Sequence, residues 1–301
     1  MKRISQRSWI VALVIGVVLI APAVVRGADG RTGYEQLFDI PKTPIAPEAP
    51  AATRDARWQQ DLAYLAKELP RLHLDPFRVT PKTSFDALVS DLETRIPKLS
   101  DNAIAVGMMR VVSSLKDGHT VMFVPKSFTT YPFAVQWFGK ELRVVGTQRE
   151  FKELFGARVL KIGTLPPDQT LERVREALSF ETEQDFRTRS ESALVSPQIL
   201  AALEVQSDES IGRFEFQLAS GAIKQQAFDS STNVTPKELG TDLFYRQRSS
   251  EPHWLEYLAD SDSIYFRYNS CEDREGFERL VGRVLEFIKT RQPKQIGRAH
   301  V

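Results

Sequence analysis

The feature that most constrains the fold is a change of hydrophobic period near residue 118. Before it, apolar residues recur at helical spacing from about 55 to 70, from about 83 to 96 and from about 101 to 115. After it, short segments alternate apolar and polar residues, which is typical of strands. Three amphipathic helices with short connections favour a helical subdomain over 55–119, followed by a mixed region over 120–250. The sequence therefore predicts an α+β fold.

The mixed region is predicted to hold short strands and short helices. The expected strands are Thr120 to Pro125, Tyr131 to Phe138, Glu141 to Gly146, Arg158 to Ile162 and Gly212 to Leu218. The expected helices are Asp168 to Leu178 and Ser196 to Val205, with a helical turn over Phe151 to Phe155. Residues 225–245 are polar and carry no pattern that favours either structure.

The last segment predicts an unfinished crossover. A strand over Ile264 to Asn269 followed by an amphipathic helix over Glu272 to Thr290 forms the first two-thirds of a βαβ unit. A buried parallel strand should come next, but the chain ends at Val301, so we expect the helix to leave its apolar face uncovered. The residues 296–301 also match one reading frame of a common sequencing adapter, which predicts that they are an artefact.

The N-terminus indicates export. Three basic residues among the first seven precede an apolar stretch from Trp9 to Leu19 and a small-residue site at Ala21 to Ala23. This order is typical of a signal peptide over 1–28, although an uncleaved anchor remains open. A proline-rich linker follows over 29–54. We expect a periplasmic, extracellular or outward-facing membrane-anchored protein, with any membrane association through residues 1–25.

Composition and motifs exclude several functions. Basic and acidic residues balance at 40 and 39, and no basic run is present, so we expect no nucleic-acid partner. Cys271 is the single cysteine, so no internal disulfide can form. No phosphate-binding loop is present, and we expect no cofactor. Because His73, His119 and His253 have no partner three or four residues away, we expect no metal site.

One short segment could carry chemistry. Asp117-Gly118-His119-Thr120 lies where the third helix ends, and Gly118 is expected to end that helix in the left-handed conformation. An imidazole at such a junction can act as general base to a hydroxyl nucleophile, with Asp117 as a possible orienting carboxylate. The alternative is a surface turn whose histidine has no catalytic role.

The other ring-bearing residues favour structural roles. His73 is interpreted as a packed loop histidine, and His253 as a loop residue that could line a cleft. The aromatic residues Tyr131, Trp137 and Trp254 are predicted to be core or edge side chains.

The segment Asp117 to Thr120 resembles the D-G-H-T motif of the tail-specific (C-terminal-processing) and tricorn-core serine peptidases. The stretches His73 to Phe77 and Leu154 to Gly163 also resemble family segments, so that the resemblance covers roughly Asp55 to Lys294 by order of elements. It implies an exported serine-type peptidase that acts on polypeptides. In the tricorn-like branch the histidine of this motif is catalytic, which makes His119 the candidate general base.

The resemblance also implies that residues 251–295 begin a crotonase/ClpP-like catalytic domain. In the family, the serine nucleophile and the oxyanion hole come later, so we expect this 301-residue chain to be inactive by itself. The family uses either a Ser–Lys or a Ser–His mechanism, and both stay open. The alternatives are a non-catalytic exported peptide-binding protein and an inactive peptidase relative.

Overall fold

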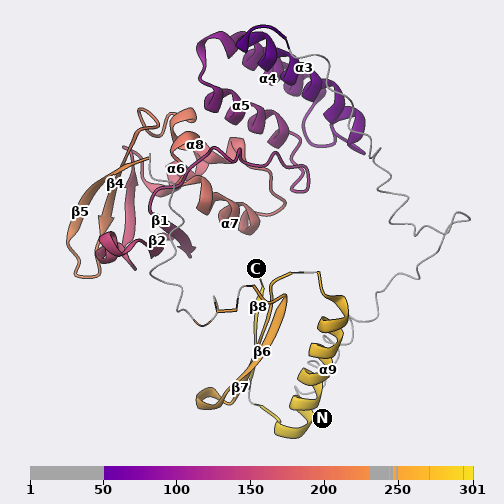
Figure 1. Ribbon diagram of the computed structural model, residues 1–301, viewed down its shortest axis with the longest axis vertical. Coiled ribbons are helices and arrows are strands. Elements are labelled where there is room, and N and C mark those ends of the chain that lie inside the picture. Colours follow the sequence, from indigo (N-terminus) through magenta and orange to yellow (C-terminus); the bar gives the residue numbers. More distant parts are fainter. Residues whose placement is uncertain are drawn as a thin grey trace, which may run out of the picture. The chain divides into compact units, whose positions relative to one another are not determined.

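The computed structural model describes residues 51–230, 244, 247–248, 250–270, 272–293 and 295–300 (Figure 1). The larger of the two units of the chain comprises residues 53–301. The predicted signal peptide and most of the predicted linker lie outside the described residues. No helix in the described ranges combines the length and the apolar character that a membrane crossing requires.

Helices make up the first part of the larger unit, as predicted. They are α3 (Arg54–Leu72), α4 (Lys82–Arg95), the 3-10 turn η1 (Ile96–Lys98) and α5 (Asp101–Ser113). Two side-chain caps begin these helices, because Thr53 accepts the Ala56 N–H and Ser100 accepts the Ala103 N–H. Pro70, where the first run of helical spacing was predicted to end, lies inside the last turn of α3.

Helix α5 is buried on two sides. Ile104, Met108 and Val111 pack into the core of the helical subdomain. Val106 and Met109 of the same helix pack into the core of the sheet. A helix that buries apolar residues on two of its faces is held by packing on both. The C-terminal end of α5 is therefore a rigid base for the turn that follows it.

A five-stranded antiparallel sheet follows, in the order β1-β2-β3-β4-β5. Its strands are β1 (Phe133–Phe138), β2 (Glu141–Thr147), β3 (Arg158–Ile162), β4 (Ile211–Gln217) and β5 (Ile223–Asp229), with the 3-10 helix η2 (Arg149–Leu154) before β3. Between β3 and β4 the chain forms α6 (Pro167–Val174), η3 (Arg175–Ala177), α7 (Glu183–Ala193) and α8 (Pro197–Ala202). Helix α7 packs on β1 and α6 on β3, while α8 packs on α5. The α+β class is thus confirmed.

Aromatic side chains form the centre of the sheet core. The Phe133 ring meets the Phe214 ring edge-on at a centroid distance of 5.0 Å, and lies 5.0 Å from the Phe228 ring. Tyr131 packs edge-on against Phe214 at 5.1 Å and is fully buried. Edge-to-face contacts of this kind stabilise a core beyond the area they bury. The predicted core role of Tyr131 is confirmed.

Within the mixed region, the structure differs from the predicted elements at three places. Residues 120–125, predicted as a strand, are turn and coil, and the Phe123 side chain is 87% exposed. Helix α7 and strand β5 were not predicted. Strand β5 lies at the edge of the sheet and buries only Phe228, so its sequence lacks the alternation of a half-buried strand.

The last part of the chain is a βαβ unit preceded by one more strand. Its elements are β6 (His253–Leu258), η5 (Ala259–Ser261), β7 (Ser263–Tyr268), α9 (Arg274–Arg291) and β8 (Gln295–His300). Strand β6 pairs antiparallel with β7, and β8 pairs parallel with β7. The expectation that the parallel strand is missing is therefore wrong. Helix α9 buries Leu280 and Val284 while Leu285 stays exposed, so its apolar face is covered in part.

Candidate functional site

The turn after α5 places the D-G-H-T segment at the end of a buried helix. The left-handed conformation expected for Gly118 occurs instead at Lys116, whose φ is 56°. A tight turn then closes with a hydrogen bond of 3.2 Å from the Thr120 N–H to the Asp117 carbonyl. The side chain of His119 projects from this turn and is 89% exposed. The imidazole is thus presented to solvent from a fixed backbone.

Gly118 is needed for close packing and not for a positive φ. A Cβ atom at this position would lie 2.7 Å from Glu181 Cγ and 2.9 Å from both Glu181 N and Phe180 C. The Gly118 N–H donates a hydrogen bond of 3.0 Å to Glu181 Oε1. The absence of a side chain here brings the 117–120 turn against the segment that precedes α7.

The Asp117 carboxylate accepts three hydrogen bonds. Its Oδ2 accepts hydrogen bonds from Thr120 Oγ1 at 2.5 Å and from His73 Nε2 at 2.9 Å, and its Oδ1 accepts the His119 N–H at 3.0 Å. The Thr120 hydroxyl, the His119 N–H and His73 hold the pKa of Asp117 well below its usual range, and they outweigh the opposing effect of burial. The carboxylate is therefore a structural anion that fixes the turn.

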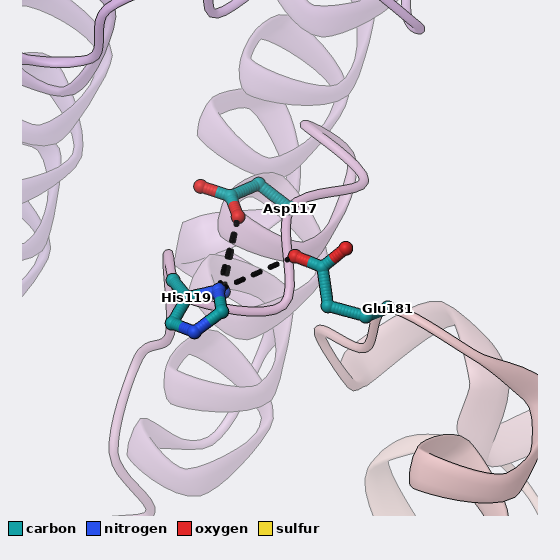
Figure 2. Close-up of side chains that lie close together, drawn as sticks. All are labelled: Asp117, His119 and Glu181. Atoms are coloured by element: carbon teal, nitrogen blue, oxygen red, sulfur yellow. Dashed lines mark hydrogen bonds and ion pairs between the residues drawn. The ribbon is translucent and has the colours of Figure 1, made fainter. Parts of the chain in front are cut away.

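Glu181 is the carboxylate nearest to the His119 ring (Figure 2). The His119 Nδ1 atom lies 3.4 Å from Glu181 Oε1 and 4.0 Å from Asp117 Oδ1. Asp117, the predicted orienting group, thus holds the backbone of His119, while Glu181 contacts its ring. The other ring nitrogen, Nε2, faces away from both carboxylates. Sequence reasoning missed Glu181, because 62 residues separate it from His119.

His73 also belongs to this cluster. It ends α3 as the C-cap residue, and its Nδ1 accepts the Asp75 N–H at 3.1 Å. An acceptor at Nδ1 places the ring proton on Nε2, which donates to Asp117. The predicted packed loop histidine is therefore a second partner of the Asp117 carboxylate. Its contact joins the end of α3 to the candidate site.

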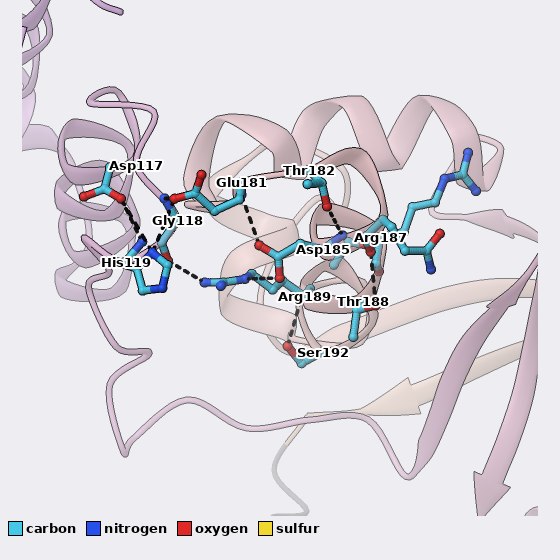
Figure 3. Close-up of polar contacts among 12 residues, drawn as sticks. Asp117, Gly118, His119, Glu181, Thr182, Asp185, Arg187, Thr188, Arg189 and Ser192 are labelled. Atoms are coloured by element: carbon cyan, nitrogen blue, oxygen red, sulfur yellow. Dashed lines mark hydrogen bonds and ion pairs between the residues drawn. The ribbon is translucent and has the colours of Figure 1, made fainter. Parts of the chain in front are cut away.

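A second network supports the site from α7 (Figure 3). Arg189 donates to the Gly118 carbonyl at 3.1 Å and to Asp185 Oδ1 at 2.7 Å. Asp185 Oδ2 accepts the Glu181 N–H at 3.1 Å. Burial by itself would raise the pKa of Asp185, but the hydrogen bonds from Arg189 and Glu181 lower it below its usual value. The Arg189–Asp185 pair thus fixes both the 117–120 turn and the segment that holds Glu181.

The remaining sequence candidates lie elsewhere. His253 is on strand β6 and not in a loop, with Nε2 3.5 Å from Asp273 Oδ2. Trp254 is buried, as predicted. Trp137 packs against the sheet core and donates to Ser190 Oγ at 3.1 Å, in keeping with its predicted edge role. None of these contacts the cluster around His119 among the contacts of the described residues.

Comparisons with known proteins give a resemblance to solved structures. No family model matches the chain, and no curated protein matches it. A point mutant of CPAF, a chlamydial serine peptidase resembling tail-specific proteases, is similar with a TM-score of 0.48 and 12% identity over 80% of this chain and 55% of that chain. Mature CPAF gives 0.45 and 11% over 77% and 53%, and mature CPAF complexed with lactacystin gives 0.48 and 12% over 78% and 54%.

The chain thus spans about half the length of these CPAF chains. Similarity at this level assigns neither a family nor an activity to the protein.

Proposed function

We propose that this protein is a serine-type peptidase that acts on polypeptides, with His119 as its general base. The observation that supports this most is the asymmetry of the His119 ring. One nitrogen faces the Glu181 carboxylate, and the other is turned toward solvent. The same asymmetry holds the imidazole of a serine–histidine–carboxylate triad in its working tautomer.

The proton positions follow from this asymmetry. A carboxylate accepts hydrogen bonds only, so the contact with Glu181 keeps the ring proton on Nδ1 of His119. The lone pair is then on Nε2, where it can take the proton of a serine hydroxyl as that oxygen attacks a peptide carbonyl. The imidazolium formed in this step is stabilised by Glu181 and by Asp117, whose nearest oxygen lies 4.0 Å from Nδ1.

The nucleophile is not assigned. In the described part of the chain, no serine hydroxyl is hydrogen-bonded to the His119 ring. The resemblance of residues 117–120 to the D-G-H-T motif supports a serine supplied by a later segment in the family's order. Export of the protein stays a prediction, and N-terminal sequencing of the purified mature protein would test it by locating a cleavage site near Ala28.

The test uses the full-length protein, including any segment that follows residue 301, and a fluorescently labelled, unfolded casein as substrate. We expect His119→Ala to lower kcat about 10²- to 10⁴-fold, because a general base contributes that much. As a positioning residue, Glu181 should act mainly on kcat, so Glu181→Gln is expected to lower kcat with little change in KM. Glu150→Gln is the matched control. This carboxylate is exposed and lies in η2, outside the segments that form the site.

Two results would refute the assignment. Full activity in His119→Ala would exclude the base role and favour a Ser–Lys mechanism. Wild-type protein that hydrolyses no casein and takes up no fluorophosphonate label on a serine would instead indicate an inactive relative.

A further inference from the structure

The residues around the candidate base form a set of metal ligands. Asp117, His119 and Glu181 each present one ligand atom, and these three atoms all lie within 4.8 Å of one another (Figure 2). Two of them come from the turn after α5, and the third comes from the residue just before the Thr182 N-cap of α7. Sequence spacing could not predict this set, because the fold brings two separate segments together.

We propose that Asp117, His119 and Glu181 bind a divalent transition metal ion, Zn²⁺ above all, and that the bound ion switches off the general base. The inhibitory part of this inference rests on the proposed peptidase function. The binding part concerns only the three side chains and can be tested without any substrate.

The distances are close to those that a tetrahedral ion needs. Zn²⁺ bonds to nitrogen and oxygen are about 2.0–2.2 Å long, so two ligand atoms in a tetrahedral site lie about 3.3–3.6 Å apart. His119 Nδ1 and Glu181 Oε1 are already 3.4 Å apart. Asp117 Oδ1 lies 4.0 Å from Nδ1, and all three ligand atoms lie within 4.8 Å of one another, so side-chain shifts of about 0.5–1.5 Å by the imidazole and the carboxylates would complete three ligand contacts.

Charge and hydrogen bonding favour the same set. The two carboxylates bring two negative charges, which match a divalent cation. A backbone N–H also fixes each ligand oxygen, because Asp117 Oδ1 accepts the His119 N–H and Glu181 Oε1 accepts the Gly118 N–H. Ligating carboxylates are usually fixed by such secondary contacts. The second oxygen of Asp117 is held by Thr120 and His73, so this ligand is well positioned before any ion arrives.

The ligand types favour zinc over the alkaline-earth ions. Ca²⁺ takes six to eight oxygen ligands, and Mg²⁺ needs octahedral oxygen ligands and keeps several waters. A set of one imidazole and two carboxylates instead suits Zn²⁺ with a fourth position open to water.

Metal binding would change the tautomer of His119. In the free protein the ring proton lies on Nδ1, beside Glu181, and the lone pair lies on Nε2. An ion between Nδ1 and Glu181 takes the Nδ1 lone pair, so the ring proton must move to Nε2 through solvent. No proton is gained or lost overall. The imidazole then has no free lone pair on Nε2 and cannot accept the proton of a serine.

The first experiment measures binding with the metal alone. Zn²⁺ is titrated into the intact, metal-free protein in competition with a chromophoric chelator, and Co²⁺ is used for its visible absorption bands. We expect His119→Ala and Glu181→Gln each to lower Zn²⁺ affinity more than tenfold, and the Glu150→Gln control to leave it unchanged. Imidazole ¹⁵N spectra should show coordination at Nδ1. Equal affinity in the wild type and in His119→Ala would overturn the site.

The second experiment measures casein hydrolysis against Zn²⁺ concentration. We expect inhibition of the wild type, reversal by EDTA, and at least tenfold less sensitivity in the residual turnover of Glu181→Gln. A protein that binds Zn²⁺ through His119 but hydrolyses nothing when metal-free would refute the proposed function and support the metal site. A protein whose turnover depends on His119 but whose Zn²⁺ affinity does not would refute the metal site and support the proposed function.

Discussion

Replacing Asp117 should destabilise the protein more than any exposed carboxylate does. Asp117→Ala removes three acceptor contacts, to Thr120, His73 and the His119 N–H. The Thr120 hydroxyl and the His119 N–H can turn to water, and each loss costs about 0.5–1 kcal/mol. His73 is only 17% exposed, so its Nε2 is left poorly hydrated, which costs about 1–2 kcal/mol. The free energy of unfolding should therefore fall by about 2–4 kcal/mol.

The assay is urea unfolding followed by circular dichroism, with Asp117→Asn and Asp86→Ala as companions. The asparagine keeps one acceptor oxygen, which can still accept hydrogen bonds from Thr120 and His73. Its NH₂ group then faces the His119 N–H, so two donors meet and that hydrogen bond is lost. We expect it to cost about half as much as the alanine. Asp86 forms an exposed pair with Lys82, and its removal should cost less than about 0.5 kcal/mol.

The effect of Asp117 should also depend on pH with a defined sign. Because the pKa of Asp117 is lowered on folding, the ionised carboxylate stabilises the protein above the ordinary value of about 3.9. This contribution is lost as the pH falls through the lowered pKa. The difference in unfolding free energy between wild type and Asp117→Asn should be largest at neutral pH and shrink below about pH 4. A difference that stays constant into acid, or an Asp117→Ala cost no greater than that of Asp86→Ala, would refute the reasoning.

Two glycine substitutions test close packing. Gly118→Ala should separate the turn from Glu181, cost about 1–3 kcal/mol and lower kcat, as thermal unfolding and casein hydrolysis would show; an unchanged Tm and rate would contradict this. Gly212→Ala places a Cβ atom 2.1 Å from Tyr131 Cζ inside the core, so we expect a similar or larger loss of stability with no direct effect on the site. Gly282→Ala, in an open position of α9, should instead stabilise by about 1 kcal/mol.

Local signals explain what could be predicted from the sequence. Helices α3 and α5 carry both an apolar face and a side-chain cap, as at Ser100, so the spacing of apolar residues and the capping residue indicate the same helix. Strand β7 (Ser263–Tyr268) and helix α9 (Arg274–Arg291) were predicted over Ile264 to Asn269 and Glu272 to Thr290 from the spacing of their apolar residues. The parallel strand β8 was not predicted. It is recognised by its pairing with β7, and its own residues carry no strand pattern.

The errors arise where tertiary contacts decide the structure. Residues 120–125 are apolar enough for a strand, but no strand among the described residues pairs with them. In the site, Asp117 and His119 could be predicted from their position after a helix, whereas Glu181 has no local signal at all. Its role depends on the close approach at Gly118, which only the folded chain reveals.

The hydrogen bond from the Gly118 N–H to Glu181 spans 63 residues, and β1, β2, β3 and α6 lie between its two ends. Closing so long a loop is entropically unfavourable until the intervening elements have folded. A chain that is still emerging during synthesis therefore carries the imidazole without its carboxylate partner. The contact between the two segments therefore depends on the prior folding of β1, β2, β3 and α6, and not on β4 and β5, which follow Glu181 in the chain.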